Sequence, residues 1–366
     1  AMVFFMTPGL ALFYGGMARS KNVLSTIMQS FFLIGVISVE FMLIGYTLIF
    51  GDDVHGIIGS LHKIGLMGTE NSIMEGVNIP EMAFIAFQCM FAIITPAIMS
   101  GSITGRMRFA PFVIFAIIWS ILIYNPMAHW VWGGGFLANL GALDFAGGLV
   151  IHVLSGVSGL VLCLLLGRRR GYGRMPMLPH HLPMTVLGGA MLWFGWFGFN
   201  AGSALGAGPL AANAVLTTQM SAAIGIVGWV LVERYHRGKP TVLGAVSGGV
   251  SGLVAITPAA GFVTPVAAIP IGFVGAICCY VAVAVLKSKF GYDDSLDAFG
   301  IHGVGGMWGA IATGLFATVS VNPDGADGLF YGGNLLIPQL ISLVVAIALA
   351  IIGTTIIFKV VSLFMD

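Results

Sequence analysis

The chain has 366 residues, of which 58% are hydrophobic, 8% are charged and 53 are glycine. No soluble fold needs this balance, so the composition predicts an all-α integral membrane protein. The formal net charge of +1 argues against nucleic-acid binding.

Eleven hydrophobic stretches follow one another along the chain, and each predicts one transmembrane helix. They cover about 1–18, 23–50, 82–103, 109–132, 147–167, 184–205, 211–232, 241–257, 265–286, 298–318 and 336–358. A span takes about 20 apolar residues, so the first stretch is short, and we expect the numbering to begin after a mature or ordered boundary. Because the stretches are continuous rather than alternating, they argue against a transmembrane β-barrel.

The basic residues predict how these helices are oriented. All of the fifteen lysines and arginines except Lys63 fall in connections that follow odd-numbered helices. The positive-inside rule then places the N-terminus outside and the C-terminus in the cytoplasm, in a multi-pass protein of the plasma (inner) membrane. We also expect the basic clusters to anchor at lipid headgroups.

The cysteines fall within predicted helices and not in outer loops, where an oxidising compartment would favour a bridge. They are Cys89, Cys163, Cys278 and Cys279. We predict no disulfide, no metal site and no cofactor.

Two pairs of ionisable residues recur in hydrophobic segments, Asp144 with His152 and Asp294 with His302. Eight helical residues span ~12 Å, so an aspartate near either interface places its histidine toward the membrane midplane. Buried ionisable groups in a membrane usually mark a pathway for a substrate or a proton. Ordinary structural histidines are the alternative interpretation.

The two aspartate–histidine pairs belong to predicted helices 5 and 10, which cross the membrane in opposite directions. This predicts a 5+5 inverted repeat within a single transmembrane domain of residues 1–366. The halves cover about 1–167 and 184–318, and a final eleventh helix covers about 336–360. Transporters built in this way hold their substrate near the midplane, between the two halves.

Aromatic side chains near the outer halves of helices 3, 4 and 6 suggest a cation site. Phe87, Phe91, Trp132 and Phe199 lie there, and each ring face contributes ~0.5–2 kcal/mol to binding a cation. The alternative is the aromatic belt at the lipid interface, to which we assign Trp119 and Trp130.

Six motifs in chain order, from helix 1 to helix 10, carry a resemblance to a known family. They are Phe13-Tyr14-Gly15-Gly16 with Lys21-Asn22-Val23, Ala86-Phe87-Gln88 with Phe91, His129-Trp130-Val131-Trp132-Gly133-Gly134-Gly135, Asp144-Phe145-Ala146-Gly147-Gly148, Gly195-Trp196-Phe197-Gly198-Phe199-Asn200-Ala201-Gly202-Ser203, and Phe299-Gly300-Ile301-His302-Gly303. Together they resemble the ammonium transporter (Amt/Mep/Rh) family, closest to its bacterial and archaeal Amt branch. The match covers almost the whole chain.

The resemblance implies a homotrimer that conducts ammonium or ammonia, and accepts methylammonium, through one hydrophobic pore in each subunit. By position, the ammonium-recruiting residues of the family match Phe91, Trp132 and Ser203, with Phe87 nearby and Asp144 organising the site without touching the ion. Its phenyl gate matches Phe91 and Phe199, and its pore histidines match His152 and His302. The resemblance also implies a PII-type signal protein as a partner, around the basic loop from Arg168 to Arg174.

Three features depart from the family pattern. Glu40 lies in the middle of helix 2, Gly105 replaces an acidic residue, and the chain stops at Asp366 without a cytoplasmic tail. A carboxylate within the membrane requires a partner, water or an extra cation site. A second interpretation is therefore an ammonium sensor on the same fold, whose C-terminus is fused to a kinase or cyclase domain.

A remote alternative from another class is an intramembrane serine protease. Ser158 and Ser251 each lie in a Gly-Val-Ser-Gly stretch of the kind found in such enzymes. Four-residue matches arise by chance in a glycine-rich chain, and no base for either serine follows from the sequence. We therefore predict that the protein is not an enzyme.

Overall fold

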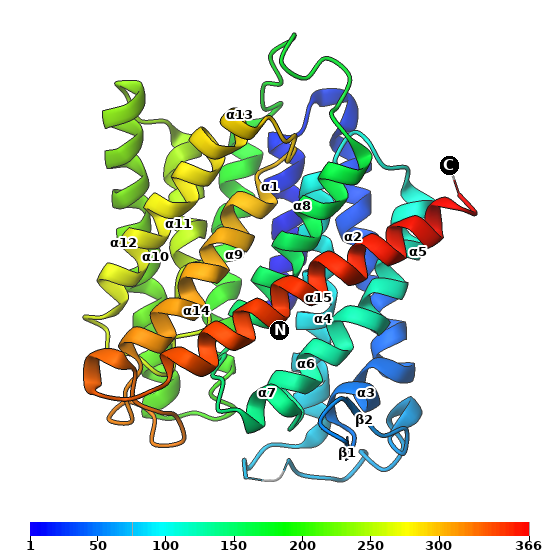
Figure 1. The fold of residues 1–366 in the computed structure, drawn as a ribbon, viewed down its shortest axis with the longest axis vertical. Coiled ribbons are helices and arrows are strands. Elements are labelled where there is room, and N and C mark those ends of the chain that lie inside the picture. Colours follow the sequence, from blue (N-terminus) through cyan, green and yellow to red (C-terminus); the bar gives the residue numbers. More distant parts are fainter. Residues whose placement is uncertain (75, 366) are drawn as a thin grey trace.

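The computed structural model describes residues 1–74 and 76–365, which form an all-α integral membrane protein (Figure 1). Glu75 and Asp366, the last residue of the chain, lie outside the described residues. Within the described residues, eight helical segments are long and apolar enough to cross a membrane, and three shorter ones complete the eleven. The expected number of helices is thus confirmed.

The helices and strands have the following bounds. The α-helices are α1 (Met6–Met17), α2 (Val23–Glu40), α3 (Tyr46–Phe50), α4 (Glu81–Ile103), α5 (Phe109–Trp119), α6 (Asn125–Trp132), α7 (Phe136–Asn139), α8 (Leu154–Leu166), α9 (Leu182–Gly202), α10 (Pro209–Arg237), α11 (Val242–Ile256), α12 (Ala268–Val281), α13 (Lys287–Phe290), α14 (Val304–Phe316) and α15 (Leu336–Ser362). Two short strands, β1 (Asp53–Val54) and β2 (Ile58–Gly59), form an antiparallel hairpin.

The two ends of the bundle differ in character. One end carries the β-hairpin and the 51–80 connection, and we call it the hairpin end. There Lys63 forms an ion pair of 2.7 Å with Glu81, which holds the connection to the start of α4. The other end carries most of the arginines, among them Arg106 and Arg169; we call it the arginine end. Figure 1 shows α15 crossing the bundle at a steep tilt, and it packs on α8, α14 and α5.

Glycines allow the helices at the centre of the bundle to approach closely. A β-carbon on Gly156 of α8 would lie 2.2 Å from the backbone nitrogen of Gly303, and one on Gly306 of α14 would lie 2.9 Å from the carbonyl oxygen of Gly148. Neither gap admits a side chain. This contact brings the segment that carries His152 against the segment that carries His302, and it agrees with the packing role of small residues in membrane proteins.

In the part of the chain that the structure describes, five segments contain π-helical turns, which widen the helix locally and are uncommon in proteins. They are η3 (Phe41–Gly45), η5 (Ser120–Tyr124), η6 (Gly148–Val153), η7 (Ala282–Leu286) and η8 (Phe299–Gly303). Four of them occur in matching places of the two halves: η5 and η7 lie in the fourth and ninth helical segments, and η6 and η8 in the fifth and tenth. These four turns therefore recur after five helical segments, which is the offset expected of a 5+5 inverted repeat.

A buried ion pair closes the arginine end. The Arg169 side chain donates to Asp293 with Nε at 2.9 and 3.0 Å and with Nη2 at 2.5 Å, and both residues are buried. Burial acts to raise the pKa of Asp293, but the hydrogen bonds and the charge of Arg169 outweigh it and hold the pKa below its ordinary value.

Replacing Asp293 by asparagine is expected to destabilise the protein by about 3–5 kcal/mol at neutral pH, because it leaves a buried arginine without its counter-charge. The lowered pKa means that the wild-type pair stabilises the fold above about pH 4, the ordinary range of an aspartate, and that this stabilisation is lost as the pH falls through the lower folded-state value. Thermal unfolding in detergent between neutral and acid pH measures both effects. A pH dependence that is the same in wild type and Asp293→Asn would contradict this role.

Candidate functional site

Two histidines face one another at the centre of the bundle. His152 of η6 and His302 of η8 are 1% and 3% exposed, and their Nδ1 atoms lie 3.2 Å apart. A hydrogen bond between the two rings at that distance requires one Nδ1 to carry the hydrogen and the other to accept it. The expectation that the two imidazoles meet, which rested only on their spacing from Asp144 and Asp294, agrees with this geometry.

Each aspartate holds the turn that carries its histidine. Asp144 accepts four backbone hydrogen bonds of 2.6–3.1 Å, from the N–H groups of residues 147–150. Asp294 accepts from the backbone N–H of Phe299 at 2.9 Å and from Ser102 Oγ at 2.8 Å. Both carboxylates therefore compensate the free N–H groups at the start of a helical segment. Gly147 precedes η6 with φ +108°, a conformation that suits glycine.

Two phenyl rings lie stacked beside the histidines, toward the hairpin end. Phe91 of α4 and Phe199 of α9 are nearly parallel, at 10°, with centroids 4.3 Å apart, and both are buried. Phe199 in turn lies 6.0 Å from the His152 ring. The phenyl pair therefore presents apolar surface next to the ring of His152.

A cavity of about 280 Å³ opens on the other side of the phenyl pair. Its lining comprises Phe50, Phe84, Phe87, Gln88, Phe91, Val131, Trp132, Phe145, Ser203 and Leu205. Phe91 contacts Phe87 and Trp132 edge to face, with centroids 4.7 and 6.0 Å away. We call this cavity the aromatic pocket. It brings together Phe87, Phe91, Trp132 and Ser203, four of the residues singled out in the sequence.

Asp144 lies behind the aromatic pocket and not in its lining. Its carboxylate oxygens accept hydrogen bonds from backbone N–H groups, and its carbonyl oxygen accepts a 2.8 Å hydrogen bond from Trp132 Nε1. Ser203 Oγ donates to the carbonyl oxygen of Phe199 at 2.8 Å, which leaves its lone pairs free to accept. Asp144 therefore positions both the indole of Trp132 and the turn of His152.

Two further residues lie in this region and were not predicted as site residues from the sequence. Trp196 stacks on His152 with centroids 5.4 Å apart and donates through Nε1 to Thr257. Gln88 lines the aromatic pocket. Both lie inside motifs quoted for the family resemblance, so the motifs themselves were the signal that could have found them.

Glu40 and Trp119 belong neither to the aromatic pocket nor to the histidine pair. Glu40 is buried against Ser120 and Asn125 and lines neither the aromatic pocket nor the histidine pair. The assignment of Trp119 to the lipid-facing belt is wrong, because Trp119 is fully buried and donates to Ser158 Oγ and Thr354 Oγ1. It packs the helices together instead.

The serines proposed for a protease make structural contacts. Ser158 Oγ accepts from Trp119 Nε1 at 3.1 Å and also bonds with Thr354 Oγ1 at 2.8 Å. Ser251 Oγ donates to the carbonyl oxygen of Ser247 one helical turn away. Neither arrangement supplies the base that an activated serine requires.

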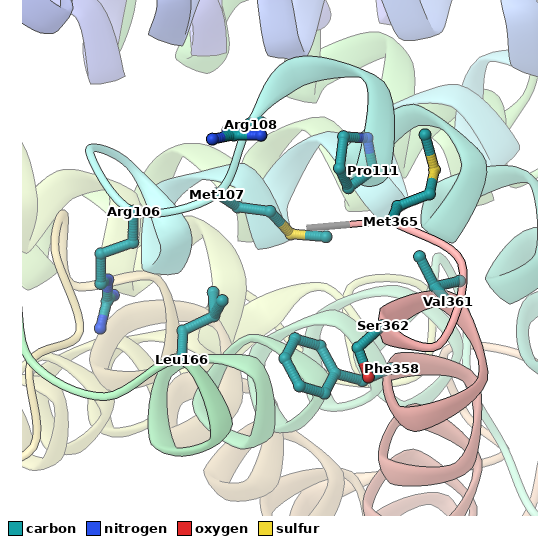
Figure 2. Close-up of a pocket in the computed structure, with 9 residues that line it drawn as sticks. All are labelled: Arg106, Met107, Arg108, Pro111, Leu166, Phe358, Val361, Ser362 and Met365. Carbon is teal, nitrogen blue, oxygen red and sulfur yellow. The ribbon is translucent and has the colours of Figure 1, made fainter.

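A second cavity of about 350 Å³ lies at the arginine end, between the α4–α5 connection and the end of α15 (Figure 2). Figure 2 shows Arg106, Met107 and Arg108 on the side of the α4–α5 connection and Phe358 of α15 on the opposite side. No residue of the aromatic pocket or of the histidine pair lines it.

Comparison with known proteins decides the family. The model of the Ammonium Transporter Family matches residues 1–366. The chain belongs to this family. An ammonium transporter of Bacillus subtilis (strain 168) is 54% identical over 366 residues, which cover 100% of this chain and 90% of that protein.

Solved structures of the ammonium transporter family share the fold. Saccharomyces cerevisiae Mep2 matches with a TM-score of 0.92 and 37% identity, over 97% of this chain and 84% of that one. A structure described as a sensor Amt protein matches with a TM-score of 0.91 and 28% identity, over 99% of this chain and 91% of that one. The ammonium transporter family is a family of transporters and not of enzymes.

Proposed function

We propose that this protein conducts ammonium or ammonia through its own subunit, along the line from the aromatic pocket past Phe91 and Phe199 to His152 and His302. The observation that carries the proposal is the unbroken succession of these groups, with ring centroids 4.3, 6.0 and 5.2 Å apart from Phe91 to His302. Membership of the ammonium transporter family supports the choice of substrate.

The aromatic pocket suits recruitment of ammonium and methylammonium. An ammonium ion loses hydration when it enters a low-dielectric site, and the ring faces of Phe87, Phe91 and Trp132 together with the lone pairs of Ser203 replace part of it. Asp144 also contributes, because its carbonyl oxygen holds the indole of Trp132 in place at the pocket. The family assigns recruitment to the same positions, which the sequence motifs match.

The histidine pair suits discrimination between ammonium and potassium. Potassium has no proton to give, whereas ammonium can cross as ammonia and a proton that move separately. Two buried imidazoles with Nδ1 atoms 3.2 Å apart offer hydrogen bonds to ammonia and a path for the proton. The phenyl pair keeps hydrated ions out of this segment.

Replacing Trp132 by leucine is expected to weaken the apparent affinity for methylammonium by roughly 2- to 30-fold, which corresponds to a cation–π contribution of ~0.5–2 kcal/mol. The maximal rate should change less than the affinity, because the histidine pair is untouched. Concentration-dependent uptake into proteoliposomes measures both quantities.

Trp130→Leu is the matched control for this experiment. Trp130 lies on the same helix but outside the pocket lining, where its Nε1 donates to the carbonyl oxygen of Ile57. An affinity that falls in Trp130→Leu but not in Trp132→Leu would contradict the assignment of the recruiting site.

The membrane arrangement and assembly complete the proposal. We place the hairpin end outside and the arginine end in the cytoplasm of a plasma-membrane homotrimer, because the basic residues gather at the arginine end. The matching π-helical turns support the 5+5 inverted repeat. Anionic lipid headgroups suit the exposed Arg108 at the cavity of Figure 2, whereas Arg106 donates to oxygen atoms of the protein, such as the carbonyl oxygen of Gly167.

A PII-type signal protein is a candidate partner at the arginine end. The loop from Arg168 to Arg174 exposes Arg168, Arg170 and Arg174, whereas Arg169 is buried against Asp293. Docking would therefore use the three exposed arginines. Arg169 would serve only to hold the loop.

Ammonium sensing is the second candidate function. It is favoured by the structural similarity to the sensor Amt protein and by the buried carboxylate of Glu40. A sensor would bind ammonium in the aromatic pocket without sustained conduction, and a fused kinase or cyclase domain would report the binding. Uptake of labelled methylammonium into proteoliposomes separates the two functions, because a sensor would bind the amine without accumulating it beyond its binding sites.

A further inference from the structure

A cluster of polar side chains lies outside the conduction line, between α2 and the η5–α6 segment. Glu40 is 7% exposed, and its carboxylate accepts from Ser120 Oγ at 3.1 Å and from Asn125 Nδ2 at 2.9 Å. Ser120 and Asn125 are fully buried. Two donors thus point at one carboxyl group, the arrangement that suits its ionised form.

Two π-helical turns meet at this cluster. Glu40 is the residue directly before η3, and Ser120 is the first residue of η5. Such turns are rare and recur at functional sites. Here they widen two neighbouring helices at the point where the carboxyl group lies between them.

The ionised carboxylate has no counter-charge from the protein. Among the residues that the structure describes, the ion pairs involve other acidic side chains, and none includes Glu40. An isolated charge buried in the membrane costs several kcal/mol or more. The carboxyl group must therefore hold either a proton or a cation.

An unused acceptor points to a cation that carries hydrogen-bond donors. Asn125 Oδ1 is buried and finds no partner within the described part of the chain. It belongs to the amide whose Nδ2 touches Glu40, so it lies beside the carboxylate. An ammonium ion donates to a carboxylate and to an amide oxygen at the same time, which satisfies both groups.

A groove of about 650 Å³ gives access to Glu40. It is lined by apolar residues of α2, η3 and the α5–η5 segment, among them Val36, Leu43 and Ile117, and Glu40 is its one ionisable lining residue. An apolar entrance rejects hydrated metal ions, whereas neutral ammonia can enter it.

We propose that Glu40, Ser120 and Asn125 form a second ammonium site, separate from the conduction line. Neutral ammonia reaches the protonated Glu40 through the apolar groove; the acid O–H bond breaks, an N–H bond forms, and an ammonium ion remains paired with the carboxylate. The site carries no net charge before or after this step, so neither state buries an uncompensated ion. The proposal does not depend on conduction through the pore.

Infrared difference spectroscopy of the full chain tests this site. Ammonium chloride is compared with choline chloride at constant pH, and the expected result is loss of a carboxylic-acid C=O band with gain of carboxylate bands. Isotope labelling of glutamate carboxyl groups should shift the lost band. Potassium chloride should leave the band in place, because potassium donates no hydrogen bond.

Variants assign the band to the cluster. Glu40→Gln should abolish the ammonium-induced change, whereas Trp132→Leu, which alters the aromatic pocket, should retain it. Asn125→Leu removes the unused acceptor and should raise the ammonium concentration at half-change by roughly tenfold, equivalent to about 1.4 kcal/mol of binding free energy.

Three outcomes would overturn the proposal. The first is a wild-type band that does not respond to ammonium or does not shift with the glutamate label. The second is the same spectral change with potassium. The third is a change that persists in Glu40→Gln. The first two use wild-type protein alone, so the proposal stays testable even where the Glu40→Gln variant does not fold. Conduction measured on the same samples is independent of these outcomes.

Discussion

Replacing either His152 or His302 by alanine is expected to abolish ammonium conduction or to make it unselective. Each substitution leaves the remaining imidazole without the partner whose Nδ1 lies 3.2 Å away, and an unpaired buried polar group costs ~1–3 kcal/mol. The space left behind admits water and ions next to the remaining ring. We expect the ratio of ammonium to potassium flux in proteoliposomes to fall by at least about tenfold, while the oligomeric state is unchanged.

His180→Ala is the matched control, because His180 is exposed and belongs neither to the histidine pair nor to the lining of the aromatic pocket. This variant should conduct as the wild type does. Wild-type selectivity in both His152→Ala and His302→Ala would rule out the paired-histidine mechanism.

Replacing Gly156 by alanine is expected to separate the two histidine segments. The new methyl group would lie 2.2 Å from the backbone nitrogen of Gly303, so α8 and η8 must move apart. Overpacking of this kind costs about 1–3 kcal/mol, and the shift also lengthens the contact between His152 and His302. A lower unfolding temperature together with reduced conduction is the expected result.

Gly35→Ala controls for the change of residue type. Gly35 lies within α2, where a β-carbon would meet nothing within 4 Å. Alanine there is expected to be neutral or to stabilise by up to ~1 kcal/mol. Equal stability and conduction in Gly156→Ala and wild type would show that the close approach at Gly303 is not required.

The sequence predicted the helices because membrane-spanning segments need long apolar runs, and it predicted the meeting of His152 with His302 from an eight-residue spacing repeated in antiparallel segments. The resemblance to the ammonium transporter family added Ser203 to the aromatic residues expected at the pocket. The length of the apolar runs and the aspartate–histidine spacing agree with the structure, because both follow from the thickness of the membrane and the rise of a helix.

Contacts between distant residues were not accessible from the sequence. Trp119 is buried because Thr354, 235 residues further along the chain, lies beside it, and no local pattern distinguishes such a tryptophan from one at the lipid interface. The pairing of Arg169 with Asp293 spans 124 residues in the same way. The π-helical turns have no recognisable composition, so the convergence of Glu40, Ser120 and Asn125 also became visible only in the structure.

Uptake of labelled methylammonium into proteoliposomes that contain the full chain distinguishes conduction from binding alone. The medium should be acidic enough that nearly all methylammonium is ionised, so that leakage of the neutral amine through the lipid is small. We predict uptake that continues well beyond one equivalent per chain, exceeds that of protein-free liposomes and is inhibited by ammonium but not by potassium. Saturable binding without sustained uptake would contradict conduction and favour the sensor.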